Sequence, residues 1–116
     1  MYKQKGKQSE LLLNINSNLE HLRENIGLIY DESHTGEITE PLVHMSIEVR
    51  YGYERGNIKY AINRAKDIVS FCDLKLKKKY FGNSIKSDLT AVKNISKGIM
   101  GYLQEYQNPQ KQRGKK

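Results

Sequence analysis

At 116 residues with one cysteine, the chain is long enough for one domain with a single core, and it cannot form an intramolecular disulfide. A composition of 37% hydrophobic and 28% charged residues is typical of amphipathic helices, in which only one side needs to be apolar. The net charge of +7 favours an anionic partner, and the apolar run at residues 11–13 is too short for a signal peptide or a membrane span. We therefore expect a cytoplasmic protein that does not enter a membrane.

Helical spacing begins at about residue 9. Over residues 9–31 the apolar side chains alternate steps of three and four, which predicts one helix with a single apolar side: Leu12, Ile15, Leu19, Leu22, Ile26 and Ile29. The polar residues 31–36 interrupt this pattern. The sequence Thr39-Glu40-Pro41 then predicts the start of a second helix, because threonine can cap and proline is tolerated in a first turn.

The second apolar pattern contains two glycines, which would let another helix approach closely: Leu42, Met45, Val49, Gly52 and Gly56. A third pattern does not continue it in register: Ile58, Ala61, Ile62, Ala65, Ile68, Val69, Cys72 and Leu76. The chain must therefore break or kink near residue 56, with Asn57 available as an N-cap. Cys72 lies within the apolar pattern, which favours a small buried side chain over a nucleophile.

A fourth helix follows Gly82, which ends the third, with Asn83 or Ser84 as its cap. Its apolar pattern runs to Asn108-Pro109: Ile85, Leu89, Val92, Ile95, Ser96, Ile99, Leu103 and Tyr106. Four such helices predict an all-α fold, an antiparallel four-helix bundle over residues 9–106. If the second and third helices are continuous, the fold becomes a three-helix bundle with a long middle helix. Residues 1–8 and 107–116 offer little apolar surface, and we expect two disordered basic arms.

The sequence shows no catalytic or metal-binding motif. The three histidines lie far apart, and none pairs with a cysteine or a second histidine at ligand spacing. No phosphate-binding loop, nucleophile elbow or zinc knuckle is present. We therefore expect neither an enzyme nor a bound cofactor or metal.

Charge is segregated along the chain. Residues 10–54 hold nine acids against two arginines, whereas residues 55–105 hold eleven bases against four acids. A basic half between basic arms is suited to a polyanion, because a surface that only confers solubility would mix both signs. Helical steps of four and seven group many of these bases on one side of each helix, and more lysines cluster at the end of the third helix than its dipole requires. We predict that ten residues contact nucleic acid: Arg55, Lys59, Lys66, Lys75, Lys77, Lys78, Lys79, Lys86, Lys93 and Lys97.

Four tyrosines lie in or beside the basic half: Tyr51, Tyr53, Tyr60 and Tyr80. Exposed tyrosines among basic residues can stack on unpaired bases. Alternatively, they line the edges of the bundle with half-buried rings and wet hydroxyl groups.

Residues 94–104 place aliphatic, basic, glycine and aromatic residues in an order that resembles the last helix of ribosomal-RNA intervening-sequence proteins. The resemblance covers residues 57–106 and extends to the accessory variability determinants of diversity-generating retroelements, although the tryptophan usual after the glycine is lacking. It implies a basic four-helix bundle, often a homo-pentamer, that assists a reverse transcriptase and contacts its RNA or DNA.

Two classes of function stay open. The first is a non-enzymatic bundle that binds RNA or DNA through its basic half. The second is a protein adaptor, chaperone or immunity-type protein whose polarised halves dock a charged protein partner, such as an acidic one. Opposite charges on the two halves also favour assembly into a homo-oligomer.

Overall fold

The computed structural model describes residues 2–33, 36–78 and 82–107. Over these residues it contains four helices and no strand: α1 (Tyr2–Ser33), α2 (Gly36–Glu54), α3 (Ile58–Leu76) and α4 (Asn83–Gln107). The predicted all-α fold is confirmed, and α2 and α3 are separate helices.

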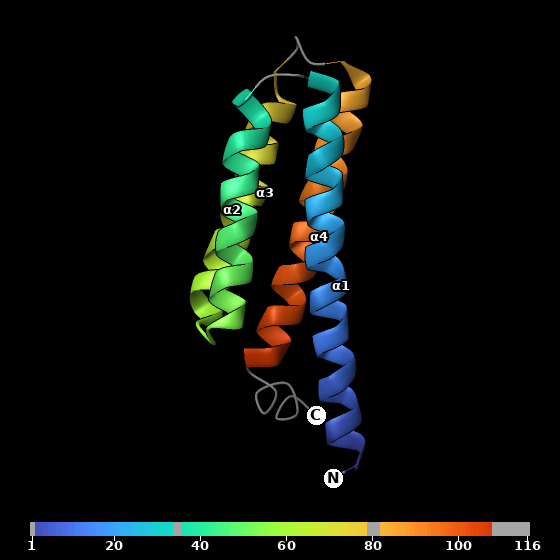
Figure 1. Ribbon diagram of the computed structural model, residues 1–116, viewed down its shortest axis with the longest axis vertical. Helices are drawn as coiled ribbons and strands as arrows, with labels where there is room; N and C mark the ends of the chain where they lie inside the picture. The colour runs from blue at the N-terminus through green and yellow to red at the C-terminus, as the bar shows by residue number, and fades with distance from the viewer. Residues whose placement is uncertain (1, 34–35, 79–81, 108–116) are drawn as a thin grey trace.

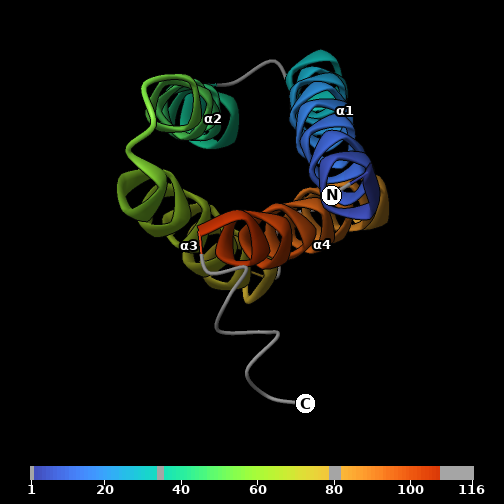
Figure 2. The same cartoon turned by 90° about the horizontal axis from the view of Figure 1, so that it is seen from below.

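The helices form an antiparallel bundle in which neighbours in sequence lie side by side (Figure 1). Seen from one end, they stand at the corners of a square, with α4 also packed against α1 (Figure 2). Each helix therefore packs against two neighbouring helices, and its buried side faces the core between them.

The buried side chains of the four predicted patterns meet in one core. Every residue of the α1 pattern and of the α4 pattern is buried or partly buried. The α3 pattern is buried from its first residue, Ile58. The buried apolar residues of the helices include Ile15, Leu19, Leu22, Ile26, Ile29, Leu42, Val49, Ala61, Ile68, Cys72, Leu89, Val92, Ile99 and Leu103. Helical periodicity therefore assigned the core side of each helix. Gly56 is the exception, because it lies beyond the end of α2 and a Cβ there would meet nothing within 4 Å.

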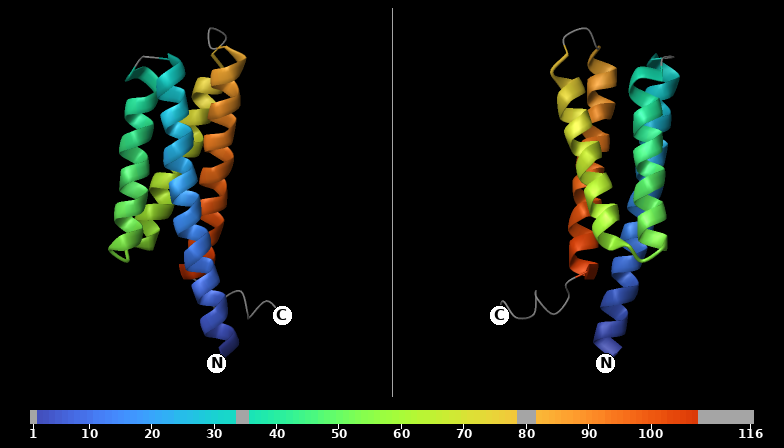
Figure 3. Two further views of the ribbon diagram at one scale, coloured as in Figure 1. Left: turned by 45° about the vertical axis from the view of Figure 1, so that its right-hand side comes forward. Right: turned by 90° about the vertical axis from the view of Figure 1, so that its left-hand side faces the viewer.

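Two predicted boundaries are corrected. α2 begins at Gly36, so that Thr39 and Pro41 lie inside it, and Thr39 is buried instead of capping the helix. The additional turn buries Ile38 completely, and this apolar burial favours extending the helix toward α1. At the other end of the molecule, α1 begins at Tyr2, and its first turns extend past the ends of the other helices (Figure 3).

The predicted arm at residues 1–8 therefore continues α1 from its second residue. Lysine and glutamine have high helix propensity, and a helix that the bundle has nucleated can propagate through them. α4 reaches Gln107, and the rest of the predicted arm at residues 107–116 lies outside the described residues. At the start of α4, the N–H of Lys86 donates to the carbonyl of Gly82 at 3.0 Å, which puts Gly82 at the cap position predicted for Asn83 or Ser84.

A three-residue turn joins α2 to α3. The N–H of Gly56 donates to the carbonyl of Tyr53 at 3.2 Å, and that of Asn57 donates to the carbonyl of Gly52 at 2.8 Å. This pair of bonds is a Schellman motif, which requires a left-handed residue, and Gly56 has a φ of 81°. The side-chain oxygen of Asn57 then accepts a hydrogen bond from the N–H of Tyr60 at 3.2 Å. Asn57 therefore caps α3, as its sequence position predicted.

Candidate nucleic-acid interface

Lysines on α3 and α4 lie along the line where these two helices meet. On α3 they recur at spacings of seven and eleven residues, which keep side chains on one side of a helix. Asp73 lies on the same side, because it follows Lys66 by seven residues. Nζ of Lys93 on α4 donates to Oδ1 of Asp73 at 2.6 Å, so this side of α3 faces α4. We call Lys93 and the five lysines in the rows on either side of this ion pair the lysine face: Lys59, Lys66, Lys77, Lys86, Lys93 and Lys97.

Three lysines of the lysine face act on the carboxylate of Asp73. The hydrogen bond from Lys93 lowers the pKa of Asp73, and the positive charges of Lys93, Lys97 and Lys77 lower it further. These three lysines come from both helices, so the two rows meet around Asp73. Asp73 cancels the charge of Lys93 and leaves the other five lysines of the face without an ion-pair partner among the described residues.

Lys75 lies on the opposite side of α3 from the lysine face. It is only two residues from Lys77, but two residues correspond to about 200° around a helix. Its Nζ lies 3.1 Å from Oε2 of Glu37 on α2 and 5.4 Å from the centre of the Phe71 ring, and its side chain is 15% exposed. These contacts remove Lys75 from the candidate interface.

Two more predicted residues, Arg55 and Lys78, also lie away from the two rows. Arg55 belongs to the turn before α3, where its guanidinium carbon lies 4.6 Å from the centre of the Tyr51 ring. Lys78 is exposed just beyond the end of α3, and Lys79 lies outside the described residues. The structure thus gathers three of the ten predicted residues around Asp73, namely Lys77, Lys93 and Lys97. Helical spacing puts Lys59, Lys66 and Lys86 in the same two rows.

The acidic half of the sequence neutralises one side of α3. Glu37 on α2 pairs with Lys75, and Glu48 on α2 lies 3.8 Å from Arg64, which also binds Asp67. Arg64 is absent from the predicted set, and its carboxylate partners explain why it is not available to a ligand. The two sides of α3 therefore differ in charge. The basic side chains that face α2 are paired with carboxylates, whereas most lysines on the side toward α4 have no ion-pair partner among the described residues.

The tyrosines separate into structural and exposed groups. Tyr53 meets Tyr106 edge to face, with ring centres 6.4 Å apart and planes at 64°. Burial raises the pKa of Tyr53, with a further contribution from Tyr106, whereas a hydrogen bond to Asn16 lowers it. Tyr53 is therefore part of the packing at this end of the bundle. Tyr80 lies outside the described residues.

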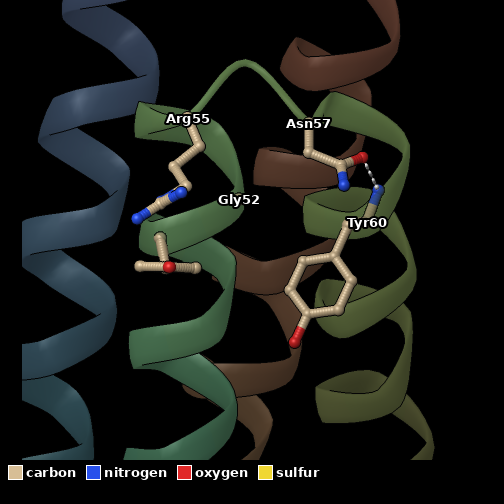
Figure 4. A pocket seen from close by; sticks show the side chains of 5 residues that line it. Gly52, Arg55, Asn57 and Tyr60 are labelled. Carbon is tan, nitrogen blue, oxygen red and sulfur yellow. Dashed lines mark hydrogen bonds between the residues drawn. The ribbon is translucent and has the colours of Figure 1, made fainter.

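The two other tyrosines line a pocket beside the α2–α3 turn (Figure 4). This turn pocket has a volume of about 210 Å³, and its lining residues are Tyr51, Gly52, Arg55, Asn57 and Tyr60. The sequence pointed to both tyrosines but did not indicate that they line one pocket, because the packing of Tyr60 on Gly52 is a contact between two helices. The signal in the sequence was the Gly56-Asn57 pair.

The described residues hold no group of three or more histidine, cysteine, aspartate or glutamate side chains placed to bind a metal ion. His21 lies beside Glu24 at 3.6 Å, His44 is exposed on α2, and His34 lies outside the described residues. Cys72 is buried as predicted, and burial raises its pKa to about 12, so the thiol stays protonated at neutral pH.

Comparison of the chain with models of known protein families, with curated proteins and with solved structures finds no match. Across the described part of the chain, no helix combines the length and hydropathy needed to cross a membrane. Functional inference therefore rests on the geometry of the lysine face and the turn pocket.

Proposed function

We propose that this protein is a non-enzymatic nucleic-acid-binding bundle that contacts phosphates through its lysine face. The observation that carries the proposal is the convergence of lysines from α3 and α4 on Asp73, which is the acid within the face. Six positive charges against one negative charge form a concentrated field, and phosphate contacts of this kind dominate the affinity of proteins for nucleic acids.

The shape of the lysine face suits the sugar–phosphate backbone. At ~1.5 Å of rise per residue, the α3 row from Lys59 to Lys77 spans about 27 Å, enough to follow several consecutive phosphates. Lysine acts as a point charge on a flexible stem and does not read base edges in a fixed geometry. We therefore expect binding with little sequence preference.

A salt titration with charge-removing variants tests this proposal. The triple variant Lys66→Gln, Lys86→Gln and Lys97→Gln removes unpaired lysines from both helices. The slope of log K against log salt should fall by about two to three on duplex DNA, because each contact contributes roughly 0.9. Arg23→Gln on the exposed surface of α1 removes one positive charge from the acidic half and is the control, which should leave the slope unchanged.

The proposal fails if gel shifts at low ionic strength are negative for single-stranded and double-stranded DNA and RNA. It also fails if the triple variant and the wild-type protein give the same salt slope. A role beside a reverse transcriptase in the cytoplasm, as the resemblance of residues 57–106 implies, is the narrower form of the same proposal.

One observation favours a second candidate, an adaptor that docks another protein. Three apolar or aromatic side chains form an exposed row on the outer side of α2 at steps of four residues, with exposed fractions of 42% for Val43, 58% for Ile47 and 52% for Tyr51. Self-association through this row would also produce a homo-oligomer. Ile47→Ser should then lower the mass in solution without changing nucleic-acid affinity, and an unchanged mass would count against this role for the row.

A further inference from the structure

The turn pocket exists because α2 and α3 approach closely at Gly52. A Cβ atom at this position would lie 2.9 Å from Cδ2 of Tyr60 and 3.1 Å from the backbone nitrogen of Ala61. Only a glycine lets the Tyr60 ring lie directly over the α2 backbone. The pocket therefore has a backbone floor at Gly52 and an aromatic wall at Tyr60 (Figure 4).

Arg55 supplies the charge of the turn pocket. Arg50 lies within 4.0 Å of Glu54 and Glu20, and Arg64 pairs with acids as well, whereas Arg55 contacts no carboxylate within the described part of the chain. Its guanidinium instead lies over the Tyr51 ring. A cation held by a ring in this way presents a flat, weakly hydrated surface, on which an aromatic ligand can stack.

The rim carries a directional hydrogen-bond donor. The side-chain oxygen of Asn57 is occupied by the N–H of Tyr60, which fixes the orientation of the amide and leaves Nδ2 toward the pocket (Figure 4). The volume of about 210 Å³ is below the roughly 300–1,000 Å³ of pockets that hold drug-sized ligands. A single planar ring system with hydrogen-bond acceptors on its edge fits these walls and this size.

The turn pocket lies next to the beginning of the lysine face. Lys59 directly precedes Tyr60 and therefore leaves α3 about 100° around the helix from it, on the α4-facing side that also carries Lys66. A strand whose base occupied the pocket would have to pass around this end of α3 to bring its next phosphates to Lys59. Aromatic surface and positive charge thus lie within one helical turn of each other at the start of α3, and single-stranded nucleic acid uses both.

The guanidinium of Arg64 lies 5.5 Å from the centre of the Tyr60 ring and covers one of its faces. We propose that the turn pocket takes up one unpaired base of a single-stranded nucleic acid, with the other face of Tyr60 and the guanidinium of Arg55 as its stacking surfaces. This inference rests on the proposed function, because the phosphates are held by the lysine face. It adds a preference for single strands over duplexes, in which bases are paired and stacked and cannot enter the pocket.

The test compares two oligonucleotides that carry the same phosphates. The full chain is titrated with a short single-stranded DNA of mixed sequence and with an abasic strand of equal length, using fluorescence anisotropy. Wild-type protein should bind the base-bearing strand roughly tenfold more tightly, because stacking on an aromatic side chain contributes ~1–3 kcal/mol per base. Tyr60→Leu should abolish this preference, and Tyr60→Phe should retain it.

Matched variants make each outcome decisive. Tyr102→Leu removes a half-buried ring from α4, and Arg23→Gln removes a guanidinium from α1, and neither should change the preference for the base-bearing strand. Arg55→Gln should reduce the preference, and because Arg55 is exposed, this variant carries the test if Tyr60→Leu does not fold. Equal binding of both strands by the wild-type protein would overturn this inference and leave the phosphate-binding proposal standing. Absence of binding to either strand would overturn both.

Discussion

Gly52 and Tyr60 approach so closely that any side chain at Gly52 would overlap the Tyr60 ring, with a Cβ only 2.9 Å from its Cδ2. We predict that Gly52→Ala destabilises the protein by about 1–3 kcal/mol, because the clash of overpacking outweighs the gain of about 1 kcal/mol in helix propensity. Gly98 on α4 is the control, since its Cβ would meet nothing within 4 Å. Gly98→Ala should stabilise by about 0.5–1 kcal/mol. Urea unfolding followed by circular dichroism measures both, and a similar gain from both variants would contradict the packing of α2 on α3.

The carboxylate of Asp73 limits the charge of the lysine face. Asp73→Asn should release Lys93 and raise nucleic-acid affinity, with the salt slope on duplex DNA steeper by about 0.9. Asp67→Asn removes the same charge from the α2-facing side of α3, where Arg64 is its partner, and should leave the slope unchanged. Lower affinity in the Asp73 variant would show that the ion pair itself is needed for binding.

Protonation of Asp73 should have the same effect on the stability of the folded protein as the substitution Asp73→Asn. Lys93 lowers the pKa of this carboxyl below its ordinary value of 3.8, so Asp73 stays charged as the pH falls toward that value. A lowered pKa means that the ionised form stabilises the folded state, and this contribution is lost only as the pH falls through the lowered pKa. Thermal melts of the wild type and of Asp73→Asn should therefore differ near neutral pH and converge in acid. A constant difference at all pH values would contradict this linkage.

Burial of Cys72 should make its thiol unreactive in the folded protein. Burial raises its pKa from 9.0 to about 12, so the neutral thiol is strongly favoured in the core. Stability that depends on the neutral thiol is present below about pH 9 and is lost as the pH rises toward 12, because the unfolded chain ionises first. Thiol titration with a disulfide reagent should be slow until denaturant is added. Cys72→Ala should remove this part of the alkaline loss of stability, and rapid labelling of the native protein would show that Cys72 is accessible.

Two core truncations test the assignment of the apolar sides. Leu19 and Val92 are buried at the middle of α1 and α4, with exposed fractions of 3% and 0%. Leu19→Ala and Val92→Ala should each cost about 2–4 kcal/mol through lost burial and the cavity that remains. Leu13→Ala, at a site that is 69% exposed, should change stability by less than about 0.5 kcal/mol. Melting temperatures unchanged by the two core variants would mean that the core was wrongly assigned.

Local patterns were sufficient to predict the helices and their buried sides. The spacing of Ile15, Leu19 and Leu22 fixes one side of α1 regardless of what packs against it, because helical periodicity is a property of the chain itself. The Asn57 cap was predictable for the same reason, since its hydrogen bond closes within three residues. By contrast, the start of α2 at Gly36 depends on the burial of Ile38 in the assembled core, which no local signal near Thr39 indicates.

Which lysines pair with carboxylates and which stay unpaired was decided by the tertiary structure. The sequence places Lys75 and Lys77 two residues apart, but it does not say that α2 lies on one side of α3 and α4 on the other. The bundle sets Glu37 against Lys75, whereas Lys77 joins the lysines around Asp73. A helix determines the angle at which each side chain leaves it, and only the packing of neighbouring helices determines what each side chain meets.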